Sequence, residues 1–288
     1  AVIDNGRAVK GYKRWLTPLV SSIFTPTAQV NGIARRRGIP IIYIDKMTKE
    51  ELAPLAAVKP DLIVVGGFSI ILKKPIIALP RIGCVNCHSS LLPKHRGPNP
   101  FQAVILGGET ETGITFHAID EGIDTGAILA QHRIPVTHSD TAGSLVRRTS
   151  QLAAEKFPEL LAQIEREGIK GNQQSAEDAS YDKKRTDDQL YLKWDRPAEE
   201  LDRMVRACFP FTIARFRYRG ATVYVSRAKA YEHDTGKPPG TITAVRPFVR
   251  VATGKGTLAV MVGYTTRKPM PWLWPGLFWR PPVGDRLE

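Results

Sequence analysis

The stretch GCVNCHSSLLPKHRG, residues 83–97, holds two sets of side chains whose spacing suits chemistry. Cys84 and Cys87 are followed directly by His88, which is the spacing of covalent haem attachment or of half a zinc site. Asn86 and His88 lie two residues apart, so in a β-strand they point to the same face. Either the thiols or the pair of amide and imidazole could be the functional set.

The cysteines favour a structural role. Haem attachment requires an oxidising compartment, and the first 15 residues lack the apolar run and cleavage site of a secretory signal. A zinc site would need two further ligands at a similar spacing, and Cys208 stands alone. Three cysteines are also too few for a disulfide framework. We therefore expect no metal, and a location in the reducing cytoplasm.

A second motif, DEGIDTG at residues 120–126, adds carboxylates. Asp120 and Asp124 lie there in a glycine-containing loop between two predicted strands. Acyl transfer to an amine needs a donor for the developing oxyanion, a base for the amine proton, and a carboxylate that holds the imidazole in its charged form. Asn86, His88 and this loop would supply that set. The alternative is a buried histidine bonded to its neighbours and an ordinary turn aspartate, which spacing alone does not exclude.

The elements that must position these side chains alternate along the first 168 residues. Short apolar runs bounded by Gly or Pro predict strands, and amphipathic runs between them predict helices. This alternation favours an α/β fold with a Rossmann-like, mostly parallel sheet and helices on both faces. Ligands of such sheets bind beyond the carboxyl ends of the strands, where the loop after His88 begins. The predicted strands are 38–45, 60–68, 81–88, 112–120 and 127–136, and the predicted helices are 48–58, 99–108 and 141–168.

The remaining residues have a different texture. Residues 169–190 are polar and indicate a linker. A short amphipathic helix at 196–209 precedes several strand-like runs separated by Gly or Pro turns, which favour a small β-barrel of the oligonucleotide-binding (OB) type. We therefore expect a catalytic domain at 1–168, the linker at 169–190 and an OB-like domain at 191–288. Its Trp- and Pro-rich tail, 268–283, has no assigned role.

Net charge and hydropathy limit the classes of partner that the protein can have. The formal net charge is +13, and residues 181–288 carry +9 of it. A basic C-terminal third suits a polyanion such as RNA, through phosphate neutralisation, or is simply a soluble basic surface. No run of about 18 apolar residues is present, so we expect no membrane span.

Two segments, NCHSSLLPKHRGPNP and ETGITFHAIDEGIDTGAIL, together resemble the folate-dependent formyltransferase family, which includes methionyl-tRNA and glycinamide ribonucleotide formyltransferases. The family pattern is Asn-x-His-x-Ser-Leu-Leu-Pro, then Arg-Gly, Thr-Gly-x-Thr and Asp-x-Gly, and its two halves lie at the right separation. The resemblance covers nearly the whole chain, more loosely after residue 180. LYLKWDRPAEELDRMVRAC, residues 190–208, is similar to the start of the C-terminal domain in the methionyl-tRNA enzyme and in amino-sugar formyltransferases.

The resemblance implies that Asn86, His88 and Asp124 form a catalytic trio that transfers a formyl group from 10-formyltetrahydrofolate to a primary amine. Asn86 would donate to the formyl oxygen. His88 would stabilise the tetrahedral intermediate and assist proton transfer. Asp124 would orient His88 or a relaying water, and its charge would raise the pKa of His88.

The resemblance also implies a pteridine pocket between the loop at 66–72 and the loop at 119–124, with hydrogen bonds from backbone groups. Ser90 and Arg96 would shape the loop after His88. The implied folate contacts are Phe68, Ser69, Ile70, Ile71, Leu72, Asp120, Glu121, Gly122 and Ile123.

Departures from the family pattern leave the amine acceptor open. The family begins with a strand and a helix that precede the first residues here, so we expect this unit, whose loop helps relatives bind the acceptor, to be missing. RGPNP (96–100) replaces Arg-Gly-Ala-Ala-Pro and, with RTDDQLYLKW (185–194), resembles formyltransferases of sugars or other small amines. The basic C-terminal third and the basic loop 6–14, which matches a tRNA-contacting loop, favour tRNA.

Methionyl-tRNA is therefore the expected acceptor, and a nucleotide amino-sugar or another small biosynthetic amine is the alternative. A 10-formyltetrahydrofolate hydrolase, in which water replaces the amine, is a further hypothesis. A catalytically idle RNA-binding protein is another, and the intact trio argues against it.

Overall fold

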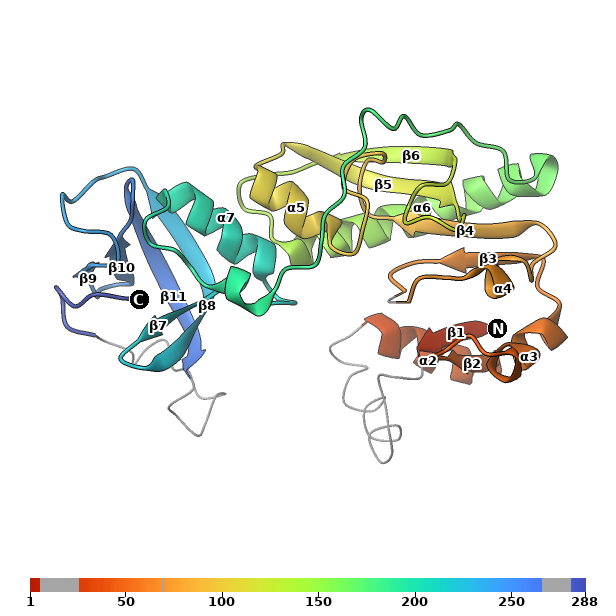
Figure 1. Ribbon diagram of the computed structural model, residues 1–288, viewed down its shortest axis with the longest axis horizontal. Helices are drawn as coiled ribbons and strands as arrows, with labels where there is room; N and C mark the ends of the chain where they lie inside the picture. The colour runs from red at the N-terminus through yellow and green to blue at the C-terminus, as the bar shows by residue number, and fades with distance from the viewer. Residues whose placement is uncertain (6–25, 69, 266–280) are drawn as a thin grey trace. The chain divides into compact units, whose positions relative to one another are not determined.

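The computed structural model describes residues 1–5, 26–68, 70–265 and 281–288, and the chain divides into two compact units (Figure 1). Unit 1 comprises Ala1–His88, Thr115–Gln131 and Lys156–Ala179, and unit 2 comprises Ser89–Ile114, His132–Glu155 and Ser180–Glu288. Ser69, the basic loop at 6–14 and most of the tail at 268–283 lie outside the described residues. Among the described residues, no helix is both long enough and apolar enough to cross a bilayer.

The strands of the first half form two sheets. β1 (Val2–Asn5) pairs in parallel with β2 (Ile41–Ile44). The second sheet has the order β3-β4-β5-β6, formed by Leu62–Val65, Gly83–His88, Glu111–Ala118 and Ile128–Pro135. β4 is parallel to β3 and antiparallel to β5. The strand that carries Asn86 and His88 therefore has a parallel neighbour on one side and an antiparallel neighbour on the other.

Helices and a buried apolar cluster support these strands in unit 1. The helices are α2 (Pro26–Arg36), α3 (Lys49–Val58) and α4 (Lys74–Ile77). Thr48 caps α3, because its hydroxyl accepts from the backbone N–H of Glu51 at 3.3 Å. Ile44, Ile63, Ile76 and Cys84 belong to one buried cluster, so β2, β3, α4 and β4 share a core.

The C-terminal half of unit 2 is an antiparallel sheet with its own core. The sheet has the order β7-β8-β11-β10-β9 and buries one apolar face, which includes Phe216, Val223, Val251 and Leu258. Its strands are β7 (Arg215–Tyr218), β8 (Ala221–Tyr231), β9 (Ile242–Ala244), β10 (Val249–Ala252) and β11 (Thr257–Thr265). The short helix η2 (Asp187–Leu190) and α7 (Ala198–Cys208) precede it.

The start of a long helix packs with α7 inside unit 2. α5 (Pro100–Gly107) and the first turn of α6 (Ala142–Glu167) share a buried apolar cluster with Ala207 of α7. Gly143 allows this close packing, because a Cβ there would lie 2.6 Å from the Pro210 ring. The backbone N–H of Gly143 also donates to the carbonyl of Phe209 at 3.2 Å.

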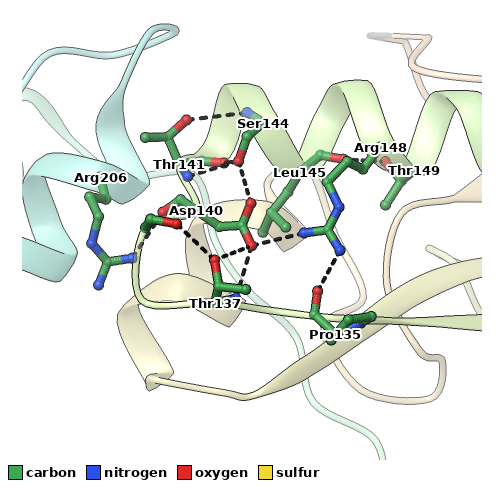
Figure 2. Close-up of polar contacts among 10 residues, drawn as sticks. Pro135, Thr137, Asp140, Thr141, Ser144, Leu145, Arg148, Thr149 and Arg206 are labelled. Carbon is green, nitrogen blue, oxygen red and sulfur yellow. Dashed lines mark hydrogen bonds and ion pairs between the residues drawn. The ribbon is translucent and has the colours of Figure 1, made fainter.

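A polar group, here named the Asp140 cluster, holds the same junction (Figure 2). The buried Asp140 carboxylate accepts from the Ser144 hydroxyl at 2.7 Å, the Arg148 guanidinium at 2.8 Å and both the N–H and the hydroxyl of Thr137. Its backbone carbonyl accepts from Arg206 of α7 at 2.9 Å. The Asp140 cluster therefore ties the start of α6 to α7.

Candidate functional site

The register of β4 against β5 decides which side chains meet. Asn86 lies opposite His117, and His88 lies opposite Thr115. Cys87 lies between them, opposite Phe116, and therefore points to the other face. This confirms the alternation read from the sequence. It also brings in His117, a residue that the sequence analysis did not single out.

Asn86 and His117 form a defined hydrogen-bonded pair. The Asn86 amide nitrogen lies 3.2 Å from Asp124 Oδ1 and 3.2 Å from His117 Nε2. Because a carboxylate only accepts, the NH₂ end of the amide must face it. His117 Nδ1 lies 2.7 Å from the carbonyl of Ala118, which also only accepts, so Nδ1 carries a proton. In the neutral ring Nε2 is then bare and accepts from Asn86.

The Asp124 carboxylate faces both histidines at longer distances. Its Oδ2 lies 3.6 Å from His88 Nδ1, and its Oδ1 lies 3.4 Å from His117 Nε2. All three side chains are largely buried, and the two imidazole rings meet edge to face with centroids 6.3 Å apart. An amide, two imidazoles and a carboxylate therefore converge in a water-poor place, where charge interactions are strong.

The loop that presents Asp124 is built by its own motif. The Asp120 carboxylate accepts from the N–H of Gly122 at 3.0 Å and from the Thr125 hydroxyl at 2.7 Å. Side chains are excluded at Gly122 and Gly126, where a Cβ would lie 2.0 Å from Thr125 Oγ1 and 1.9 Å from the carbonyl of Ala118. Asp124 itself has a φ of 55°, a left-handed conformation that Asp and Asn adopt more readily than other residues with a Cβ.

The thiols of the motif are protonated at neutral pH, and Cys84 is buried while Cys87 is half-buried. Burial raises the pKa of Cys84 to about 11 and that of Cys87 to about 12. The Cys84 thiol contacts the carbonyl of Ile77 at 3.7 Å. Within the described ranges, no group of three His, Cys, Asp or Glu side chains could hold a metal ion.

The side chains of the predicted folate loops differ in exposure. Phe68 and Ile70 pack against the core of unit 1, and Leu72 is buried. Ile71 is 58% exposed and Ile123 is 38% exposed, so both are open to a ligand. Glu121 is exposed and pairs with Lys74 at 3.6 Å. Their roles in folate binding stay predictions.

Ser90 and Arg96 belong to unit 2 and organise the loop between them. The buried Ser90 hydroxyl donates to the carbonyl of Lys94 at 2.8 Å. The backbone of Arg96 exchanges hydrogen bonds with Ser180 and Asp182. His95, between them, has one ring nitrogen 2.7 Å from Asp182 and the other 2.7 Å from Glu109.

Gln174 is a second residue that the sequence analysis missed. Its side-chain NH₂ donates to the backbone carbonyls of Asp124 at 2.9 Å and Gly126 at 2.7 Å. The residue lies in the polar segment after α6, where no periodicity marks a contact. His117 lies within a quoted motif, but only the pairing register shows that it faces Asn86.

Comparison with known proteins identifies a family to which both halves of the chain are similar. The formyl transferase profile matches residues 29–161, and the formyl transferase C-terminal domain profile matches residues 184–272. The methionyl-tRNA formyltransferase of Halorhodospira halophila (strain DSM 244 / SL1) is 36% identical over 232 residues, which are 80% of this chain and 75% of the relative.

Two solved structures are similar in fold. HypX from Aquifex aeolicus, in complex with tetrahydrofolic acid, gives a TM-score of 0.62 at 21% identity, covering 79% of this chain and 40% of HypX. The sugar 3N-formyl transferase WlaRD, with dTDP and 5-N-formyl-THF, gives 0.62 at 21% identity, covering 93% and 88% of the two chains. With both domain profiles and a curated relative in agreement, this chain belongs to the formyl transferase family.

Proposed function

We propose that the protein transfers a formyl group from 10-formyltetrahydrofolate to the amino group of methionyl-tRNA, with Asn86, His88 and Asp124 as catalytic residues. The observation that carries this proposal is the convergence of these three side chains with His117 in unit 1. A relative named for methionyl-tRNA and a similar structure solved with a formylated folate support the two substrates.

The reaction makes one bond to the formyl carbon and breaks another. The acceptor nitrogen attacks the formyl carbon, its oxygen becomes negative in the tetrahedral intermediate, and the bond from the carbon to N10 of the folate then breaks. The acceptor amine loses a proton and N10 gains one. Asn86 donates to the oxygen, and His88 stabilises the intermediate and moves the proton.

Asp124 and His117 have supporting parts in this proposal. The Asp124 carboxylate stabilises the charged form of His88, because it lies 3.6 Å from His88 Nδ1. His117 accepts from Asn86 and thereby holds the direction of its NH₂ group. Since both Asn86 hydrogens are engaged, donation to the formyl oxygen replaces one of these bonds.

The outer side of the C-terminal sheet supports tRNA as acceptor. Its inner side is apolar, so the residues that alternate with the core point outward. We name this surface the basic–aromatic face, and it comprises Tyr191, Arg215, Arg217, Tyr224, Lys229, Tyr231 and Arg250. Within it the Arg215 side chain is largely buried and pairs with Asp187 at 3.1 Å. Arg250 stacks 4.6 Å from the Tyr231 ring centroid, and Arg215 stacks 5.2 Å from that of Tyr224.

Such a face suits a nucleic acid more than a small amine. Guanidinium groups neutralise phosphates, and tyrosine rings offer stacking surfaces for bases. We therefore propose that the sheet is of the OB type. We also propose that the protein acts in the cytoplasm, as the cysteine content predicts. The four cation–π pairs formed by Arg215, Arg217 and Arg250 with tyrosines support the nucleic-acid partner.

Tetrahydrofolate release from 10-formyltetrahydrofolate tests the function. The protein is assayed with methionyl-tRNA, with a pool of nucleotide amino-sugars and with no acceptor. We expect release with methionyl-tRNA alone. Release with amino-sugars alone would show that the acceptor is an amino-sugar and not methionyl-tRNA. Equal release without acceptor would indicate a hydrolase. No release under any condition would contradict the proposal that the protein is a formyltransferase.

The salt dependence of tRNA binding tests the partner. Arg217→Ala and Arg250→Ala should each weaken binding and lower the slope of log K against log salt by up to about one, as lost phosphate contacts do. Arg81→Ala is the matched control, because Arg81 is exposed in unit 1 and pairs with Asp61. Equal effects of all three would show that only net charge matters.

A further inference from the structure

Gln174 reaches the Asp124 loop from a distant part of the chain. Its side-chain NH₂ spans two carbonyls, those of Asp124 and Gly126, at 2.9 and 2.7 Å. One side chain therefore fixes the peptide group that follows Asp124 and the one that follows Gly126. All three residues lie in unit 1.

The segment that carries Gln174 is itself fixed by its backbone. Asn172 and Ile128 exchange two hydrogen bonds, at 2.8 and 2.9 Å, at the start of β6. Gly171 permits this approach, because a Cβ there would lie 2.6 Å from the carbonyl of Ile128. Gln174 therefore leaves an anchored backbone and does not depend on a free linker for its position.

The backbone at Asp124 decides where its carboxylate points. Its φ of 55° lies in the left-handed region, which Asp adopts less often than the right-handed one, and a change to the right-handed region would turn the carboxylate away. The carboxylate lies 3.2 Å from the Asn86 amide nitrogen, 3.6 Å from His88 Nδ1 and 3.4 Å from His117 Nε2. Asp120 bonds Gly122 and Thr125 and leaves the carbonyl of Asp124 to Gln174.

We propose that Gln174 is a positioning residue that holds Asp124 in its left-handed conformation, and so directs the carboxylate at Asn86, His88 and His117. This inference rests on the proposed function for the role of Asp124. It adds Gln174, from a polar segment without a motif, to the residues that position the site.

The test compares two glutamines one residue apart. Gln174→Glu replaces the donating NH₂ with a carboxylate of similar shape, facing two carbonyl oxygens. Gln173→Glu makes the same charge change on an exposed side chain and is the control. In single-turnover formyl transfer we expect Gln174→Glu to lose about 10- to 100-fold, as for a misplaced catalytic group. Gln173→Glu should stay within about twofold of wild type.

A double mutant distinguishes positioning from general damage. If Gln174 acts through Asp124, then Gln174→Glu should reduce the residual rate of Asp124→Asn by less than about twofold, because the two changes remove one function. Losses that multiply in the double mutant would overturn the proposal. So would equal rates for Gln174→Glu and Gln173→Glu.

A second readout does not depend on activity. Amide hydrogen exchange of residues 122–127 should be faster in Gln174→Glu than in Gln173→Glu at equal melting temperature, and equal exchange would overturn the proposal. If wild type transfers no formyl group, the proposed function fails while this measurement still decides the role of Gln174. Should Gln174→Glu not fold, Gln174→Met removes the donors without adding charge.

Discussion

Two aspartates with mostly buried side chains, Asp124 and Asp140, differ in the number and length of the contacts that their carboxylates make. Asp140 is the centre of the Asp140 cluster, with four donors at 2.7–3.0 Å and a guanidinium among them (Figure 2). Asp124 sits in a left-handed conformation, and its carboxylate meets an amide and two imidazoles at 3.2–3.6 Å. Both side chains are mostly buried, so burial does not distinguish them.

The two carboxylates differ in their hydrogen bonds and in their backbone conformation. Short hydrogen bonds from Ser144, Thr137 and Arg148 saturate the Asp140 carboxylate. These bonds stabilise the start of α6. Asp124 has a left-handed backbone and faces the two imidazoles at 3.4–3.6 Å. The first arrangement suits a structural role, and the second suits the catalytic role proposed for Asp124.

The largest expected effect is on catalysis at Asp124. Asp124→Asn keeps the shape and tolerates the left-handed backbone, but removes the charge that we propose stabilises a protonated His88. We expect kcat to fall about 100- to 10,000-fold with an unchanged melting temperature. Stopped-flow assay of tetrahydrofolate release and thermal melting provide the two measurements. A near-normal rate would remove Asp124 from the trio.

The converse change at Asp140 should act on stability. Asp140→Ala removes the buried carboxylate that accepts from the hydroxyls of Thr137 and Ser144 and from the Arg148 guanidinium. We expect a loss of about 2–4 kcal/mol in the free energy of unfolding, measured in urea, with kcat of the folded fraction retained. A variant of normal stability and low kcat would reverse the comparison.

The pH dependence of stability gives a smaller, signed effect. Burial raises the pKa of Asp140, but hydrogen bonds from Ser144, Thr137 and Arg148 outweigh it and lower the pKa below its ordinary value. The stabilisation is therefore complete above the unfolded pKa of about 3.9 and is lost as pH falls through the folded pKa. The stability difference between wild type and Asp140→Asn should shrink below about pH 4. A constant difference from pH 7 to 3 would contradict this.

The smallest effect is expected at Cys87, between the two proposed catalytic residues of β4. Cys87 lies on the opposite face of the strand, and burial raises the pKa of its thiol to about 12. Cys87→Ser should change kcat by less than about twofold, and the native thiol should resist iodoacetamide near pH 7.5. Rapid alkylation with parallel loss of activity would place the thiol at the reacting face.

The sequence predicts one part of this site well and another part not at all. Alternation along 83–88 separates Cys87 from Asn86 and His88, and the motif around Asp124 contains the glycines that its loop requires. The register that brings His117 to Asn86 depends on tertiary pairing of β4 with β5, which local pattern does not contain. Gln174 sits in a polar segment with no period to read.

The boundaries 1–168, 169–190 and 191–288 and the OB type of the C-terminal sheet rest on composition and strand pattern, and the folate contacts rest on resemblance; all of these remain predictions. The parallel pairing of β3 with β4 and the antiparallel C-terminal sheet agree with the strand patterns in the sequence. The antiparallel pairing of β4 with β5 departs from the mostly parallel sheet that the sequence predicts. Polar side chains at strand ends have no such periodic signature, because their partners come from distant segments.

The junction of α5, α6 and α7 has a consequence for how such proteins exchange parts in evolution. The C-terminal profile begins at residue 184, yet Ala207 packs in a cluster with Val104 and Leu145, and Gly143 leaves room for Pro210. A recombination event at 184 would therefore separate surfaces that fit one another. Functional chimeras should therefore keep a small residue at 207 together with glycine at 143, so we expect the two halves of the gene to be inherited together.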